Sequence, residues 1–273
     1  MLGGQRVFLK AKKSLGQCFL VNRGVAEAEA EHALGKRVLE LGPGYGMLTR
    51  ELCARAERVV AVEIDSNLFR LLKANIEAGN LKLINKDFFE ADEKELELDS
   101  TDIMISNVPY KLSSKVIDFL IAHKLQVVLC LQKEFVDHKL AEPGTRKYSK
   151  LSVVSQLCFS MTRLIDVPKG NFRPMPKVDS KLVYMNPREG CVGREENAVI
   201  GAIMQHKKKT VRNAILDSHK AFGMSQKQLL PVAEKVGVKD SRLFKLSPTQ
   251  ILGVARELLP TVGSSLAPVS AEV

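Results

Sequence analysis

The stretch VLELGPGYGMLTREL, residues 38–52, decides the fold class. Its apolar beginning predicts a buried strand, and its amphipathic end predicts the first turns of a helix. Gly42, Gly44 and Gly46 lie between the two. A glycine turn in this position brings backbone N–H groups and a helix N-terminus close to a ligand, although a plain strand–helix turn would also accept glycine. The stretch predicts a strand–turn–helix unit suited to ligand binding.

The same alternation continues over residues 37–133. Short apolar runs, expected to be strands, alternate with helix-length amphipathic segments: RVLEL, MLTRELCARA, RVVAVEI, SNLFRLLKANIEAG, LKLIN, TDIMIS, SSKVIDFLIAHK and QVVLCLQ. Such alternation predicts a parallel sheet with crossover helices on both faces and ligands at the carboxyl ends of its strands. Residues 151–167 and 180–186 are interpreted as strands joined by a Pro-rich loop, which predicts an antiparallel hairpin at one edge. The fold class is therefore α/β and Rossmann-like.

The pattern changes to helices after residue 186. Three amphipathic segments follow at residues 197–216, 224–237 and 247–258, the last beginning with Ser247 as N-cap and Pro248 in the first turn. We expect a first domain over residues 1–186, a small helical domain over residues 187–273, and a frayed tail at the end of the chain.

The formal charge of +10 and the pI near 9.4 favour an anionic partner. Basic residues gather in two acid-free clusters, one in residues 1–20 that includes Lys12 and Lys13, and HKKKTVR at residues 206–212. Either cluster alone could be a solvated helix face. Together they favour nucleic acid, whereas membrane binding would need a strongly apolar helix face beside the charges, and Trp is absent from the chain. We expect Lys207, Lys208, Lys209 and Arg212 to contact RNA phosphates.

Cysteine usage and hydropathy predict a cytoplasmic protein. The five cysteines are far apart and form no C-x-x-C pair, so we expect reduced thiols and no zinc or other metal site. No run of about 18 apolar residues exists, and the charged N-terminus does not resemble a signal peptide.

The glycine spacing points to a particular cofactor. It is G-x-G-x-G, whereas a dinucleotide fingerprint starting at Gly42 would need glycine where Met47 stands. This spacing, followed by Glu63 at the end of the next strand, resembles the loop of S-adenosylmethionine (SAM)-dependent methyltransferases. A carboxylate at Glu63 can accept hydrogen bonds from both ribose hydroxyls, a role it could equally serve for NAD.

A further acidic strand end adds to the predicted pocket. Asp87 could accept a hydrogen bond from an adenine amino group, and Phe88 could lie against the adenine ring. Asp87 could instead simply cap the segment that follows it. Acidic and glycine-rich ends on three successive strands favour the SAM pocket.

The stretch ISNVPYKLSS, residues 105–114, follows the fourth predicted strand and resembles the N-P-P-Y motif of methyltransferases that act on exocyclic amino nitrogens. The Asn107 side-chain oxygen and the backbone carbonyl of Val108 or Pro109 can accept the N–H protons of an adenine amine and direct its lone pair. Pro109 holds these acceptors rigid. Tyr110 offers a face on which a flipped-out base can stack. The alternative is a buried tyrosine after a proline turn.

Nearly the whole chain resembles the family of small-subunit ribosomal-RNA adenine N6,N6-dimethyltransferases (KsgA type). The matching segments are KKSLGQCFL, LELGPGYGML, VEID, NKDFF, SNVPY, LQKEFVDHKLAEPGTRKYSKLSVVSQ, NFRPMPKVDS and QHKKKTVRNAI. The resemblance implies methyl transfer from SAM to two adjacent adenosines near the 3′ end of small-subunit rRNA, within a pre-ribosomal particle. It makes residues 1–22 a basic lid segment of a catalytic domain, and residues 187–273 an rRNA-binding domain.

The resemblance also implies roles for individual residues. Cofactor contacts would come from Leu20, Gly42, Gly44, Glu63, Asp87 and Asn107, with Asn107 also the catalytic acceptor. Phe172 would stack on the target adenine opposite Tyr110, unless it is simply a core aromatic residue. Where the bacterial pattern reads GQNFL this chain has Cys18, whose thiol cannot reproduce the hydrogen bonds of asparagine, so only a backbone contact with the cofactor is expected there.

Other functions remain open at this point. An antibiotic-resistance methyltransferase of large-subunit rRNA shares the pocket motifs, and a non-catalytic assembly or transcription factor could use the same fold. The helical domain and the FRPMPKVDS form favour the small-subunit enzyme, and the intact Asn107 and Tyr110 favour activity. An NAD-dependent dehydrogenase is disfavoured by the glycine spacing. We expect a monomer.

Overall fold

The computed structural model describes residue 12 and residues 16–263, without the side chain of Tyr110. The chain forms two compact units. The first contains Met1–Lys133 and Thr162–Asn186, and the second contains Glu134–Met161 and Pro187–Val273. Residues 134–161, which the sequence boundary at residue 187 placed in the first domain, thus belong to the second unit.

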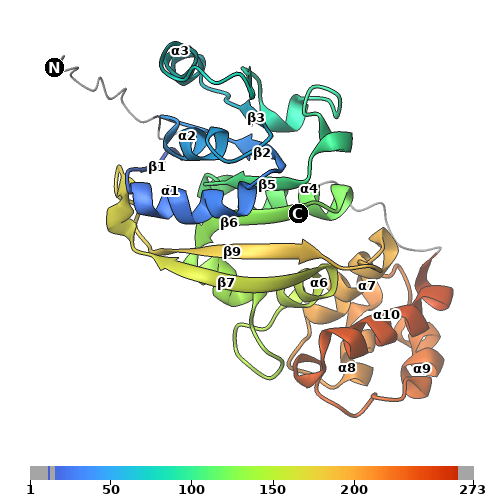
Figure 1. Cartoon of the computed structure of the whole chain (residues 1–273). Coiled ribbons are helices and arrows are strands. Elements are labelled where there is room, and N and C mark those ends of the chain that lie inside the picture. Colours follow the sequence, from blue (N-terminus) through green and yellow to red (C-terminus); the bar gives the residue numbers. More distant parts are fainter. Residues whose placement is uncertain (1–11, 13–15, 264–273) are drawn as a thin grey trace. The chain divides into compact units, whose positions relative to one another are not determined.

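The first unit is built on a seven-stranded sheet of order β4-β3-β2-β5-β6-β9-β7 (Figure 1). The strands from β4 to β6 are parallel, and β9 pairs antiparallel with β6. This confirms the predicted mostly parallel sheet with an antiparallel edge. The strands are β2 (Arg37–Leu41), β3 (Arg58–Val62), β4 (Leu81–Ile84), β5 (Ile103–Ser106), β6 (Gln126–Gln132), β7 (Phe159–Val167) and β9 (Ser180–Pro187).

Helices cover the central strands because these strands are apolar on both faces. Residues of β5 are entirely buried, as are all but the first residues of β2 and β3. Buried residues of α1 and α2 share one core with β2, β3, β5 and β6. The helices outside the second unit are α1 (Arg23–Ala30), α2 (Met47–Cys53), α3 (Ser66–Asn75), α4 (Ser113–His123) and the start of α5 (Lys133–Lys139).

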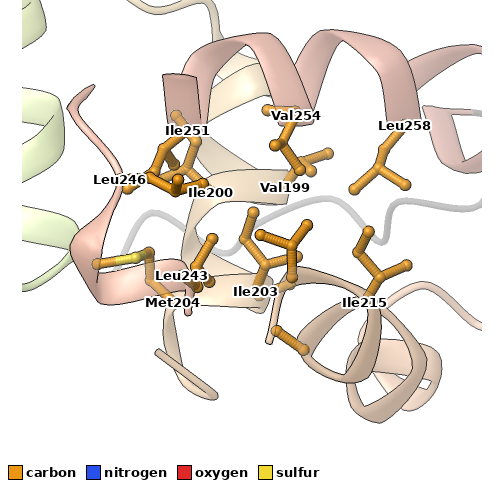
Figure 2. Packing of buried hydrophobic residues seen from close by; sticks show 14 of the residues in the cluster. Val199, Ile200, Ile203, Met204, Ile215, Leu243, Leu246, Ile251, Val254 and Leu258 are labelled. Atoms are coloured by element: carbon orange, nitrogen blue, oxygen red, sulfur yellow. The ribbon is translucent and has the colours of Figure 1, made fainter. Parts of the chain in front are cut away.

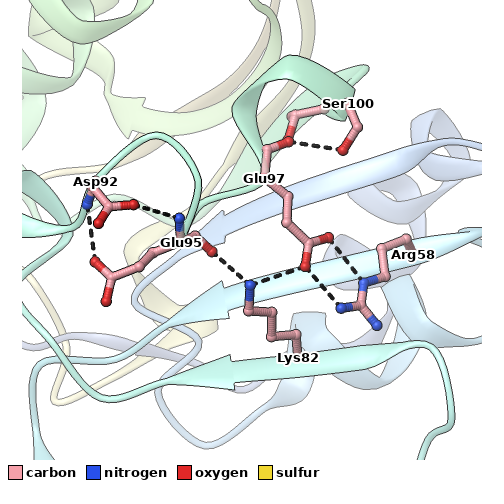
Figure 3. Close-up of polar contacts among 7 residues, drawn as sticks. Arg58, Lys82, Asp92, Glu95, Glu97 and Ser100 are labelled. Atoms are coloured by element: carbon pink, nitrogen blue, oxygen red, sulfur yellow. Dashed lines mark hydrogen bonds and ion pairs between the residues drawn. The ribbon is translucent and has the colours of Figure 1, made fainter.

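The amino end of the sheet carries a paired polar network, shown in Figure 3. Arg58, at the start of β3, donates two hydrogen bonds to the Glu97 carboxylate at 2.9 and 3.1 Å, and Lys82 of β4 contacts the same carboxylate at 3.0 Å. These cations lower the pKa of Glu97 to about 2, the Arg58 hydrogen bonds being the largest cause.

The second unit is a helical domain with its own apolar core. Figure 2 shows Val199, Ile200 and Ile203 of α7 in contact with side chains from α8 and α10. Its helices are α6 (Lys150–Cys158), α7 (Arg194–Met204), α8 (Val211–Asp217), α9 (Gln226–Lys235) and α10 (Pro248–Val262). Ser247 caps α10 by accepting from the Gln250 N–H, as its sequence predicts.

Two predictions of secondary structure are wrong. Residues 151–158 were expected to begin a strand, but they lie in α6, where Ser149 and Ser152 form a capping box. The β-branched pair Val153 and Val154 suggested a strand, and the packing of this helix in the second core outweighs that propensity. Residues 197–216 form two helices, because Thr210 starts a new one as N-cap.

The expectation of reduced thiols is also wrong at one place. Cys158, at the end of α6, forms a disulfide with Cys191, whose Cα lies 4.3 Å away, while Cys18, Cys53 and Cys130 are free. The 33 residues between the partners concealed this pairing, since it arises only when β9 returns the chain to α6. No helix in the described ranges has the length and apolar character needed to cross a membrane.

Candidate active site

The glycine turn follows β2 and has a backbone that favours glycine. Gly42, Gly44 and Gly46 have φ values of +68°, +60° and +77°. A Cβ at Gly44 would lie 2.8 Å from the Phe19 ring, and one at Gly46 only 2.5 Å from Ile76. Space is open at Gly42, where no atom of the described residues lies within 4 Å of such a Cβ. The turn is thus closed on two sides and open at Gly42.

Glu63 connects the ends of β2 and β3. Its Oε2 accepts from the Gly44 N–H at 3.1 Å and its Oε1 accepts from the Asp65 N–H at 2.9 Å, although the side chain is only 3% exposed. Burial is the main cause that raises the pKa of Glu63, and the two backbone donors oppose it. Each oxygen retains a lone pair for a further donor.

A cleft opens beside this turn at the carboxyl ends of the parallel strands. Its volume is about 210 Å³, room for many waters rather than one. Seven of the predicted cofactor residues line it, namely Cys18, Gly42, Gly44, Glu63, Asp87, Phe88 and Asn107. Leu20 lines an adjoining pocket, which shares Gly42, Gly44 and Asn107 with the cleft.

Two of these residues also have structural contacts. Asp87 accepts from the Phe89 N–H at 3.0 Å, so it caps the short helical turn that follows, which was the alternative considered for it. Phe88 is buried with its ring packed edge-on against Phe119, at a centroid distance of 5.0 Å. Sequence reasoning missed Ile64, which lines the cleft directly after Glu63 and is 47% exposed, unusual for an apolar side chain at a strand end.

Asn107 has an unsatisfied oxygen. Its Nδ2 donates to Glu29 Oε2 at 2.9 Å, while its Oδ1 is buried and has no hydrogen-bond partner among the described residues. Such an atom is costly unless a ligand satisfies it. Glu29 was not predicted, because nothing in its local sequence distinguishes it from Glu27, the other glutamate of α1.

A second, small pocket also borders Asn107. It is lined by Gly16, Cys18, Asn107, Val108, Pro109, Cys130 and Phe172. Its volume of about 10 Å³ is close to that needed for one water and far below that of a purine. Phe172 is 3% exposed and begins β8 (Phe172–Arg173), which pairs antiparallel with β1 (Phe19–Leu20). Tyr110 starts a short helical turn, and its side chain lies outside the described part.

The two basic clusters are partly engaged within the protein. Lys12 forms an ion pair with Asp65 at 2.9 Å, and Lys13 lies outside the described residues. In the second unit the Lys207 amine donates to the backbone carbonyls of Arg146 and Tyr148. These hydrogen bonds connect the basic cluster to the loop before α6.

The rest of the second cluster remains at the surface. Lys209 pairs with Asp217, and Arg212 pairs with Glu234. Lys208 is exposed and lines a groove with Lys209 and Arg242. Lys208 is thus the member of the cluster best placed to meet an external anion.

Comparison with known proteins decides the family. The model of the family described as ribosomal RNA adenine dimethylase matches residues 8–257. The chain belongs to this family. It is 34% identical, over 93% of its length and 95% of the relative, to the probable ribosomal RNA small subunit methyltransferase A of Methanopyrus kandleri. It is accordingly a SAM-dependent rRNA adenine methyltransferase.

Solved structures agree with this assignment. A dimethyladenosine transferase from Plasmodium falciparum superposes with a TM-score of 0.77 at 26% identity, covering 89% of this chain and 98% of that one. The 23S rRNA methyltransferase ErmE, with a TM-score of 0.64 and 23% identity over 88% of this chain and 99% of that one, shares the fold. The residues present fit SAM, since Gly42 leaves open space, Glu63 has free lone pairs and Asn107 Oδ1 has no partner among the residues that the structure describes.

Proposed function

We propose that the protein dimethylates N6 of two adjacent adenosines in the 3′-terminal loop of small-subunit rRNA, as a step of small-subunit maturation. The observation that carries the proposal is the Asn107 side chain, which borders the cleft with a buried oxygen that has no partner in the described structure. An amide oxygen in this position is suited to accept an N–H of an adenine amine.

The cleft residues would hold the cofactor. The Gly42 backbone, the second lone pairs of the Glu63 carboxylate and the exposed face of Ile64 provide room, acceptors and an apolar surface. Asp87 keeps acceptor capacity on its carboxylate beyond the bond to Phe89. When bound, SAM supplies a methyl group on a positively charged sulfur.

The strand end at Asn107 would orient the target. Asn107 Oδ1 accepts one N–H of the adenine amine and the carbonyl of Val108 or Pro109 accepts the other, so the nitrogen lone pair points toward the cleft. Positioning of this kind and the matching electrostatics supply the rate enhancement. Tyr110 and Phe172 stack on the base. Stacking contributes roughly 1–3 kcal/mol per base to binding, which is comparable to the few kcal/mol needed to extrude the nucleotide.

Entry of the base requires movement. Because the pocket beside Phe172 holds about 10 Å³, a purine enters only if the segment that carries Gly16 and Cys18, or the β1–β8 pair, moves aside. Cys18, Asn107 and Pro109 border both this pocket and the cleft, so the two sites adjoin.

The helical domain over residues 187–273 would bind rRNA in a pre-ribosomal particle, and the protein would act as a cytoplasmic monomer. Lys208, Lys209 and Arg212 would contact phosphates, together with Lys12 and Lys13 of the N-terminal lid segment. The positive net charge of the chain supports this assignment.

Incubation with isotopically labelled SAM and immature small subunits, followed by mass spectrometry of the rRNA, tests the proposal. We expect dimethyladenosine in the small subunit with the wild-type protein and none with Asn107→Ala, whereas the exposed Asn75→Ala remains active. Dimethyladenosine in large-subunit rRNA instead would select the resistance-type enzyme. Absence of label from both subunits would select a binding factor.

A further inference from the structure

We infer that Glu29 is a positioning residue for the methyl transfer: its carboxylate holds the Asn107 amide so that Oδ1, and not the NH₂ group, faces the target amine. This inference rests on the proposed function of Asn107. Glu29 itself contacts neither the cleft nor the small pocket. It would act entirely through Asn107.

The placement of Glu29 is determined by α1. Asn22 starts this helix by accepting from the Gly24 N–H at 2.9 Å, and the buried positions Val25, Ala26, Glu29 and Ala30 form its inner face. That face packs on the sheet, with Ala26 and Ala30 in the same core as Ile105 and Cys130. Glu29 is therefore a fully buried acid in an apolar layer next to the end of β5.

The contact between the two side chains has a direction. When Glu29 is ionised its carboxylate has only acceptors, so it favours the orientation in which the NH₂ group of Asn107 lies 2.9 Å from Glu29 Oε2. The other amide atom, which has no partner in the described structure, is then the oxygen. With the amide turned around, two N–H donors would face an amine that is itself a donor. Glu29 thus sets the polarity on which the proposed chemistry depends.

The contacts of Glu29 do not stabilise the fold in a way that would explain an acid at this position. Asn107 and Glu40 are the groups that affect its pKa, Glu29 in turn affects that of Cys130, and no cation in the described part of the chain is among the causes of its shift. Its second oxygen, Oε1, is buried without a hydrogen bond there. A buried acid with this environment costs stability, and such a cost is typical of residues kept for function.

The charge state of Glu29 couples the amide to pH. Burial is the main cause that raises its pKa to about 8, the Asn107 hydrogen bond lowers it, and Glu40 raises it further. Protonated Glu29 becomes a donor and can stabilise the reversed amide. The orienting form is the carboxylate, so methyl transfer should increase as pH rises through this range.

Three variants test the inference. Glu29→Leu removes the acceptor at similar size, Glu29→Gln keeps an acceptor that does not titrate, and Glu27→Gln is a control on the solvent side of α1. We expect Glu29→Leu to lower kcat about 10- to 100-fold, the usual effect of a misplaced catalytic group, with SAM affinity by calorimetry within twofold and a melting temperature that does not fall. Glu29→Gln should retain more activity than Glu29→Leu but lose the alkaline rise in kcat. A kcat of Glu29→Leu within twofold of the wild-type value would overturn the inference. So would a pH profile of kcat for Glu29→Gln that matches the wild-type profile.

A spectroscopic measurement keeps the test independent of turnover. The side-chain NH₂ signals of Asn107, identified by their loss in Asn107→Ala, should shift with pH around a midpoint near 8 in the wild type and in Glu27→Gln, and should not do so in Glu29→Gln. Signals that are equally insensitive to pH in all three proteins would exclude the coupling. If no rRNA is methylated by the wild type, the proposed function fails while this titration still reports on Glu29 and Asn107.

Discussion

The buried acid Glu40 predicts an unusual dependence of stability on pH. Glu40 lies in β2, two residues before Gly42, is 1% exposed, and has an Oε2 without a hydrogen-bond partner in the described structure. Burial is the main cause that raises its pKa to about 8. We therefore consider the variant Glu40→Gln, whose side chain resembles the protonated acid in shape and cannot titrate.

The sign and size follow from proton linkage. Between the ordinary pKa of 4.5 and the native value of about 8, native Glu40 holds a proton that the unfolded chain releases. Stability from this group is fully present below pH 4.5 and is lost as pH rises, by about 1.4 kcal/mol for each pH unit. Across the whole window the loss amounts to about 5 kcal/mol. Glu40→Gln should not show this loss.

Urea denaturation at pH 5, 6, 7 and 8 measures the effect. We expect the difference between the free energy of unfolding of Glu40→Gln and that of the wild type to increase by about 1.4 kcal/mol for each unit by which the pH rises. His32, whose pKa is lowered mainly by burial, changes stability in the opposite direction, but it is present in both proteins and cancels in the difference. The exposed Glu57→Gln serves as control. A constant difference between Glu40→Gln and wild type from pH 5 to pH 8 would refute the reasoning.

Two further predictions concern the second unit. Lys208→Ala should reduce the slope of log affinity for rRNA against log salt concentration by about 0.7 to 0.9, the contribution of one phosphate contact. A filter-binding series in which the variant gives the wild-type slope would exclude Lys208 from the interface. Cys191→Ser should lower the free energy of unfolding, measured without reductant, by about 3–4 kcal/mol, because the disulfide closes a loop of 33 residues. Thiol titration of the denatured wild-type protein should count three free thiols, and a count of five would show that the bond does not form.

The sheet and most of the cofactor cleft could be predicted because their signals are local. Each parallel strand is a short apolar run, and a parallel sheet brings the carboxyl ends of its strands together whatever the rest of the chain does. Gly42, Glu63 and Asp87 follow three such strands, so their meeting in one cleft required no knowledge of side-chain contacts.

Predictions failed where contacts distant in sequence outweighed local propensity. Val153 and Val154 favour a strand in isolation, yet they lie in a helix that completes the second core. The contacts of Lys207 were likewise not predictable from its basic run, because carbonyls about 60 residues away in sequence accept from its amine.

The sequence by itself determined the order of strands and helices, the glycine turn and the asparagine at the end of β5, because hydrophobic period and backbone preference act within a few residues. Only the tertiary structure decided which way the Asn107 amide faces, since its partner Glu29 lies 78 positions earlier and is brought to it by the packing of α1 on the sheet. A hydrogen bond has direction and short range, so it exists only once folding has placed both groups within about 3 Å.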